Sequence, residues 1–194
     1  MAEFSDEELC KKVAQRDRNA FELLVERHQA RAYRLAFSIL GSESDARDVS
    51  QDAFIRLYES AGRFDGRSRF STWFYRVLVN LCIDHKRRGR WWRRIITLSG
   101  PEEGGDQPTG GSLSIDPPSP DPGPELAAIR GQDAARLSDA LGKLSDNQRI
   151  AVLLQVYEGL SSREVGQTLN CSENTARVHV HRGLAQLRKI LKNE

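Results

Sequence analysis

Hydrophobic positions recur at helical spacing through the N-terminal half of the chain. Between residues 19 and 40 the apolar side chains follow an i, i+3, i+4 order that places them on one face of a helix. Gly41 is a typical C-terminal cap for that helix. The pattern also predicts a short helix ending near Gln15, a helix over about 42–61, a loop over 62–71 and a fourth helix after it. Short connections between four helices are typical of a bundle.

A stretch rich in proline and glycine separates this bundle from the rest of the chain. All seven prolines lie between Pro101 and Pro124. Such a segment cannot bury enough apolar surface to offset the cost of ordering its backbone, and its composition suits a tether. We therefore expect residues 95–125 to be a flexible linker between two domains, 1–94 and 126–194.

Helical spacing returns after the linker. We expect helices over residues 125–142, 146–157, 162–169 and 173–191. A serine precedes each of the last three helices at the N-cap position. Only Asn170, Cys171 and Ser172 separate the last two, and a short helix, a tight turn and a longer basic helix are the outline of a helix-turn-helix. Helical hairpins without a DNA role share this outline. Both halves predict an all-α protein.

Composition limits where such helices can act. The chain of 194 residues has a formal net charge of +2, so affinity for nucleic acid has to come from local patches. Residues 86–94 carry six basic side chains, whereas residues 95–125 carry six acids and neither Lys nor Arg. The three cysteines have neither metal-ligand nor disulfide spacing, and no signal peptide or membrane span is visible. We expect a cytoplasmic protein without a metal site or cofactor.

Residues 63–94 combine basic and aromatic side chains around the fourth helix. Three arginines lie in the preceding loop, four aromatic residues follow between 70 and 75, and the helix ends in a basic run. At about 100° per residue, Thr72, Arg76 and Asn80 form a narrow polar stripe opposite the apolar face. Because basic charge attracts phosphate and aromatic rings can stack on unpaired bases, the stretch predicts contact with nucleic acid and with opened strands. The alternative is a core helix whose arginines extend to solvent.

The last helix has a similar division. Its apolar residues share an inner face, while Val178, His181 and Arg182 lie near the opposite side. Arginine can make bidentate hydrogen bonds to guanine in the major groove, so this face suits DNA. The alternative is an ordinary solvated basic face.

The chain resembles the bacterial sigma-70 family of RNA polymerase sigma factors, in its two-domain extracytoplasmic-function group. The motifs are DARDVSQDAFIRLY (Asp45–Tyr58), FSTWFYRVLVNLCIDHKRR (Phe70–Arg88) and LSDNQRIAVLLQVYEGLSSREVGQTLNCSENTARVHVHRGLAQLRK (Leu144–Lys189). They are similar, in order, to the region 2 helix that docks on polymerase, the helix that reads and melts the −10 promoter element, and region 4, which recognises the −35 element. The resemblance covers nearly the whole chain apart from the linker.

The resemblance implies a residue set for each contact. For docking on the clamp helices of the polymerase β′ subunit, the residues are Asp45, Asp48, Gln51, Asp52 and Phe54. For the −10 element, they are Phe64, Arg67, Ser68, Arg69, Phe70, Thr72, Trp73, Arg76, Asn80, Lys86, Arg87 and Arg88. For the −35 element, they are Arg149, Ser162, Arg163, Arg177, Val178, His181 and Arg182. Arg47 stands where the family usually has an acid.

The resemblance implies a sigma factor that binds core RNA polymerase, with contacts to the β′ clamp helices and the β flap, and directs it to promoter DNA. It also implies control by an anti-sigma factor, which could hold the protein at the inner membrane although the chain has no span of its own. We expect no enzymatic activity, because no catalytic motif is visible. The rivals are an ordinary helix-turn-helix regulator with an N-terminal effector bundle, which leaves the aromatic and basic fourth helix unexplained, and an enzyme built on a helical bundle.

Overall fold

The computed structural model describes residues 4–98 and 135–192, with side chains for 4–89 and 135–192, and its regular elements there are all helical. We call residues 4–98 the first domain; it contains α1 (Asp6–Ala14), α2 (Arg18–Leu40), α3 (Glu43–Ser60), the 3-10 turn η1 (Ala61–Arg63) and α4 (Phe70–Leu98). We call residues 135–192 the second domain; residues 135–142 are helical, followed by α6 (Asp146–Val152), the π-helical turn η2 (Leu153–Tyr157), α7 (Ser162–Leu169) and α8 (Glu173–Lys192). The expected all-α class is confirmed.

Helix ends follow the local sequence closely. Ser5 and Glu8 form a capping box at the start of α1, and Ser161 and Glu164 form another at the start of α7. Gly41 ends α2 in the left-handed conformation, with φ of 75°, which glycine adopts without steric cost. These residues satisfy backbone groups that a helix leaves unpaired at its ends.

The fourth helix differs from the expectation at its C-terminal end. α4 continues to Leu98, so residues 95–98 of the predicted linker are helical. The remainder of that linker and the start of the predicted 125–142 helix lie outside the described residues. The side chains of Trp91 and Trp92, to which the sequence assigned no role, lie outside them as well.

An aromatic cluster fixes α4 in the first domain. The rings of Phe70 and Phe74 stack with centroids 5.8 Å apart, and Phe54 of α3 lies 5.0 Å from Phe74. His28 of α2 contacts the ring of Phe70 at 5.1 Å. Aromatic contacts of this kind add about 0.5–1.5 kcal/mol each to the burial of apolar surface. The apolar face of α4 is therefore held against α2 and α3, which fixes the direction of its polar stripe.

Two glycines allow the helices of the second domain to approach closely. A side chain at Gly183 of α8 would meet Val152 of α6 at 2.7 Å, and one at Gly166 of α7 would meet the carbonyl oxygen of Cys171 at 2.9 Å. Asn170 ends α7 in the left-handed conformation, with φ of 53°. The expected turn between α7 and α8 is confirmed, and Gly166 explains how it folds back on its own helix.

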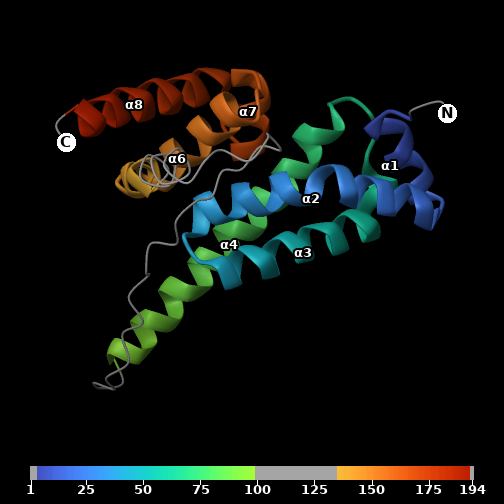
Figure 1. The fold of residues 1–194 in the computed structure, drawn as a ribbon, viewed down its shortest axis with the longest axis horizontal. Helices are drawn as coiled ribbons and strands as arrows, with labels where there is room; N and C mark the ends of the chain where they lie inside the picture. The colour runs from blue at the N-terminus through green and yellow to red at the C-terminus, as the bar shows by residue number, and fades with distance from the viewer. Residues whose placement is uncertain (1–3, 99–134, 193–194) are drawn as a thin grey trace, which may run out of the picture.

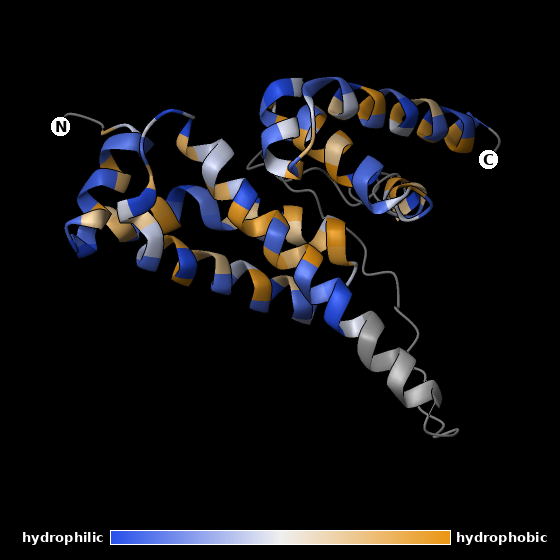
Figure 2. Ribbon diagram, turned by 180° about the vertical axis from the view of Figure 1, so that it is seen from behind, coloured by the Kyte–Doolittle hydropathy of each residue, from blue (hydrophilic) through white to orange (hydrophobic). Residues whose placement is uncertain are grey.

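The two domains are in contact with each other. Figure 1 shows the second domain lying along α2 and α4, with α3 on the other side of the bundle, and the most extensive contact between the domains is that of α4 with α7. Figure 2 shows that hydrophobic residues line the facing sides of the first-domain helices, while hydrophobic and hydrophilic residues alternate along α8.

The described cysteines form no disulfide. Cys10 and Cys82 are buried and Cys171 is half-buried. Burial raises the pKa of the Cys82 thiol to about 12, which keeps it protonated and unreactive at neutral pH. In the ranges that the structure describes, no helix is both long enough and apolar enough to cross a membrane.

Candidate polymerase and nucleic-acid interfaces

The outer face of α3 presents an acidic and partly apolar surface. Asp48, Gln51 and Asp52 are exposed and lie within two turns of each other. Ile55 follows them on the same side and is 55% exposed, which is unusual for a large apolar residue. The sequence interpretation missed Ile55, although its i+4 and i+7 spacing from Gln51 and Asp48 would have placed it on this face.

Two members of the predicted docking set lie elsewhere. Phe54 is 8% exposed and packs against Phe74, so its ring belongs to the core of the first domain. Asp45 is half-buried, and its Oδ2 lies 3.3 Å from Nε2 of His85 on α4. The exposed apolar member of the α3 surface is therefore Ile55, whereas Phe54 supports the helix from behind.

The loop before α4 holds its basic residues outward. Gly66 has φ of 71°, and the Asp65 side chain accepts a hydrogen bond from the backbone N–H of Arg67 at 3.0 Å. Arg67 and Arg69 are exposed and Ser68 is half-buried. The Gly66 conformation turns the chain sharply and leaves both guanidinium groups in solvent.

The aromatic side chains beside this loop are mostly buried. Phe70 is fully buried and Phe64 is 9% exposed, so both belong to the core. Trp73 is half-buried and lies 5.5 Å from the ring of Phe64. Of the three predicted stacking residues, Trp73 alone keeps a partly exposed ring, while Phe64 and Phe70 hold it in place.

The polar stripe of α4 is divided between solvent and the second domain. Arg76 and Asn80 are exposed. Thr72 is only 2% exposed, and its Oγ1 donates a hydrogen bond to Oε1 of Glu164 on α7 at 2.9 Å. The stripe was expected to face nucleic acid along its whole length, but one end of it contacts another part of the same chain.

The basic run at the far end of the stripe is divided in the same way. Arg87 and Arg88 are exposed, and Arg87 forms a surface ion pair with Asp84 at 3.1 Å. Lys86 is half-buried; its ammonium group forms an ion pair with Asp146 at the start of α6 and approaches the Ile39 carbonyl oxygen at 3.4 Å.

A third contact between the domains lies between the Thr72–Glu164 and Lys86–Asp146 contacts. The hydroxyl of Tyr75, which is 1% exposed, donates to Oε2 of Glu158 at the end of η2. Burial raises the pKa of the Glu158 carboxyl, while the Tyr75 hydrogen bond and the positive charges of Arg31 and Arg34 oppose that rise. Burial and the nearby carboxylate also raise the pKa of Tyr75, so its hydroxyl remains a donor. Sequence reasoning missed this contact, because Tyr75 reads there as one more apolar residue of a core helix.

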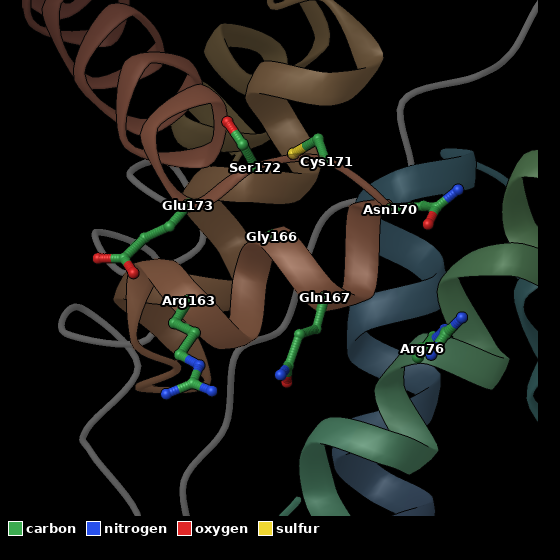
Figure 3. Close-up of a pocket in the computed structure, with 8 residues that line it drawn as sticks. All are labelled: Arg76, Arg163, Gly166, Gln167, Asn170, Cys171, Ser172 and Glu173. Atoms are coloured by element: carbon green, nitrogen blue, oxygen red, sulfur yellow. The ribbon is translucent and has the colours of Figure 1, made fainter.

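A pocket of about 500 Å³ lies at the edge of the domain contact. Figure 3 shows Arg163 and Gln167 extending from α7, with Gln167 lying between Arg163 and Arg76 of α4. The turn between α7 and α8 completes the lining. One predicted −10 residue and one predicted −35 residue therefore lie around the same pocket.

The outer face of α8 is open. Arg177, His181 and Arg182 are exposed and Val178 is 39% exposed. Arg177 also forms an ion pair with Glu173 one turn earlier, at 2.6 Å. The structure thus places four predicted −35 residues on one continuous helical surface, which is the shape that enters a major groove.

The other predicted −35 residues differ in exposure. Arg163 is exposed at the start of α7, and Ser162 is half-buried and donates to Gln155 at 3.3 Å. Arg149 is half-buried, with its guanidinium group donating to the carbonyl oxygens of Leu141 at 2.8 Å and Gly142 at 2.7 Å. It also donates to the Ile39 carbonyl of the first domain at 3.2 Å. Arg149 was expected to contact phosphate, but its donors here are used within the protein.

Comparisons with known proteins agree with this division. A family model described as Sigma-70 region 2 matches residues 24–93, and one described as Sigma-70, region 4 matches residues 134–187. The chain is 30% identical to the ECF RNA polymerase sigma factor SigW of Bacillus subtilis, over 94% of this chain and 95% of that protein. It is 35% identical to the ECF RNA polymerase sigma factor SigE of Mycolicibacterium smegmatis over 89% of this chain, which spans 62% of that longer protein.

A solved structure shares the fold. The sigma factor RpoE of Bartonella quintana, in complex with the anti-sigma factor NepR, matches with a TM-score of 0.66 and 21% identity. The match covers 89% of this chain and 96% of that one.

Proposed function

We propose the function of this protein from its family, because the chain belongs to the sigma-70 family of RNA polymerase sigma factors, in its extracytoplasmic-function group. The protein is a transcription initiation factor that binds core RNA polymerase and directs it to promoters through a −10 contact and a −35 contact. The observation that carries this proposal is the presence, in one chain, of an acidic helical face on α3 and separate basic surfaces on α4 and α8.

The α3 surface is the proposed docking site for the β′ clamp helices of polymerase. Asp48, Gln51 and Asp52 supply charge and hydrogen bonds, and Ile55 supplies apolar contact area. Complementary charge speeds association and fixes the register of two helical surfaces. Asp45 and Phe54 act behind this surface, through His85 and through the aromatic core. The second domain is proposed to contact the β flap.

The −10 surface is proposed to hold one unpaired strand. Extracting a base costs a few kcal/mol of stacking, which the protein has to return through stacking and hydrogen bonds. Asn80 offers a donor and an acceptor to a base edge, and Trp73 offers a partly exposed ring. Phe64 and Phe70 support that ring from the core. The remaining members are proposed to hold the sugar–phosphate backbone or the loop, namely Arg67, Ser68, Arg69, Thr72, Arg76, Lys86, Arg87 and Arg88.

The −35 surface is proposed to read duplex DNA with α8. Arg177, Val178, His181 and Arg182 face the base edges, while Ser162 and Arg163 contact phosphate at the start of α7. Contacts to phosphate position the protein, and contacts to base edges carry the sequence information. Arg149 positions the second domain through its carbonyl contacts, and a phosphate contact would require it to exchange some of them.

Regulation and location follow from the same premise. We propose that an anti-sigma factor controls this protein, as the RpoE relative is found in complex with one. The site of action is the cytoplasm, where polymerase and promoters are, and the anti-sigma factor could retain the protein at the inner membrane. The chain is proposed to carry out no covalent chemistry itself; polymerase supplies catalysis.

Run-off transcription with purified core polymerase tests this function. Promoters mapped after overexpression serve as templates, and we expect specific transcripts only when the protein is present. The variant Asp48→Arg with Asp52→Arg should lose co-migration with core polymerase in size-exclusion chromatography, because it places positive charge against a basic partner. Glu22→Arg with Glu26→Arg, which reverses two exposed acids of α2, is the matched control and should retain it. Absence of both a core complex and specific transcripts for the unaltered protein would favour the ordinary helix-turn-helix regulator.

A further inference from the structure

One kind of pair recurs in the contact between the two domains. Three of its contacts join a donor on α4 to a carboxylate of the second domain, while a fourth runs from Arg149 of the second domain to the Ile39 carbonyl oxygen of α2. The pairs are Thr72 with Glu164, Tyr75 with Glu158, and Lys86 with Asp146. The acids come from three different elements, so the second domain presents a row of carboxylates along α4.

The row is held firmly at its centre. In this arrangement Tyr75 is 1% exposed and Thr72 is 2% exposed, so both donors meet their carboxylates away from water. Hydrogen bonds to a carboxylate are stronger than those between neutral groups, and they are stronger still away from water. Arg31 and Arg34 of α2 add attraction for Glu158. These terms favour the closed arrangement.

The contact also has a cost that keeps it reversible. Oε1 of Glu158 is buried and has no hydrogen-bond partner among the described residues. A buried acceptor without a partner is unfavourable by about 1–3 kcal/mol. Separation of the domains would return this oxygen to water, so the closed arrangement is poised to open rather than locked.

The row occupies groups that the −10 surface needs. Thr72 and Lys86 belong to the proposed −10 set, and each now donates to a carboxylate. A carboxylate row resembles a phosphate backbone in charge and in accepting hydrogen bonds. A DNA strand that followed the polar stripe of α4 to Thr72 or Lys86 would have to displace Glu164 or Asp146.

We propose that the second domain competes with the promoter strand for α4, with Asp146, Glu158 and Glu164 standing in for DNA phosphates. This inference rests on the proposed −10 role of α4. The two domains share one chain, so the competitor is always present at high effective concentration. The affinity for a −10 strand falls in proportion to the fraction of molecules that are open. With a closed-to-open ratio of about ten, that affinity falls about tenfold.

The test uses the full chain and two measurements. The variant Asp146→Asn with Glu158→Gln removes two charges from the row while leaving the proposed DNA-binding residues intact. Its radius of gyration is measured by small-angle X-ray scattering, and its affinity for a labelled single strand carrying the mapped −10 sequence is measured by fluorescence anisotropy. We expect a larger radius and binding about tenfold tighter.

The matched control is Glu26→Gln with Glu59→Gln. It removes two exposed acids from the first domain, away from the contact, and so reproduces the gain in net positive charge. We expect no change in radius and less than twofold tighter binding. Tyr75→Phe is a second test, because it removes one hydroxyl without altering charge or packing volume. Tyr75→Phe should also increase the radius of gyration and tighten binding of the −10 strand. If circular dichroism shows that the double variant is unfolded, Tyr75→Phe alone tests the competition.

The results separate this inference from the proposed function. If the double variant, or Tyr75→Phe in its place, matches the control in affinity, the competition is overturned, whether or not the radius increases. Run-off transcription with core polymerase is measured in parallel. If specific transcription succeeds but the variants bind the −10 strand no more tightly than the control, only the competition is overturned. If specific transcription fails, the proposed function is overturned, and the scattering result then describes domain closure alone.

Discussion

The two candidate DNA surfaces have similar sequence patterns but different surroundings. On α8, His181 and Arg182 face solvent, while the inner face meets α6 so closely that a side chain at Gly183 would overlap Val152. On α4, Asn80 faces solvent, but Thr72 lies under Glu164 of the other domain. Both helices are amphipathic, and only one is free along its whole polar face.

The difference shows that an amphipathic pattern identifies a polar face without identifying what covers it. The proposed −35 face of α8 is open to duplex DNA in this arrangement. The proposed −10 face of α4 is open to a single strand at Arg76 and Asn80 but covered at Thr72. Substitutions on α8 should therefore change DNA binding directly, whereas those on α4 act on a surface whose availability depends on the second domain.

The largest expected effect belongs to Arg182 on the open surface. Arg182→Ala should weaken binding to the mapped −35 duplex by about tenfold or more, since a good base contact is worth about 1–3 kcal/mol of discrimination. Binding to a scrambled duplex should change much less, because the lost contact is to a base edge. Fluorescence anisotropy with both duplexes measures the two affinities.

The control for this prediction lies in the same domain but outside α8. Arg136 is exposed and is not a member of the proposed −35 set, so Arg136→Ala removes equal charge without altering the α8 face. It should weaken both duplexes slightly and equally. Equal losses for Arg182→Ala on the two duplexes would show that Arg182 contacts phosphate and does not read a base edge.

A smaller effect is expected for Asn80 on the covered helix. Asn80→Ala should reduce run-off transcription from a promoter with the mapped −10 sequence by about fivefold to tenfold, because one base contact is lost. Asn80 is exposed and outside the pairs that join the domains. Asn80→Ala should therefore lower the affinity for the −10 strand by the same factor in the unaltered chain and in the variant Asp146→Asn with Glu158→Gln. An exposed α2 residue supplies the control, Gln29→Ala, which should leave transcription unchanged. Normal promoter choice by Asn80→Ala would remove Asn80 from the −10 surface.

Local features of the fold could be predicted from the sequence. The α7–α8 turn follows from Asn170 at the end of α7, Ser172 at the start of α8 and the spacing of the two helices, which are properties of neighbouring residues. The all-α class and the apolar face of α4 follow from periodicity alone. On the outer face of α3 the acids Asp48 and Asp52 are exposed as expected, whereas Phe54 is buried and the exposed apolar residue is the adjacent Ile55. Successive residues lie about 100° apart on a helix, so the spacing of Ile55 from Gln51 and Asp48 was sufficient to place it on that face.

The contacts between domains could not be predicted in this way. Thr72 and Glu164 are 92 positions apart, and Tyr75 and Glu158 are 83 apart. Each acid has a local explanation in the sequence, as a cap or as a solvated side chain. Arg149 likewise reads as a phosphate contact until the carbonyl oxygens of Leu141 and Gly142 are placed beside it. What was missing in each case is the position of a distant backbone or domain, which no local pattern contains.

The smallest expected effect concerns Arg163, which lies where the two surfaces meet. Arg163 and Arg76 line the same pocket, one from each domain, so we expect their like charges to repel weakly through solvent when the domains are closed. Arg163→Ala should weaken −35 and scrambled duplexes alike, by about twofold to fivefold, and reduce the slope of log affinity against log salt by about one, because a phosphate contact is lost. It should also weaken binding of the −10 strand slightly, since removal of the repulsion favours the closed arrangement. Arg136→Ala, an exposed charge of the same domain away from the pocket, should leave −10 binding unchanged. Tighter binding of the −10 strand by Arg163→Ala would show that Arg163 stabilises the closed arrangement instead of opposing it.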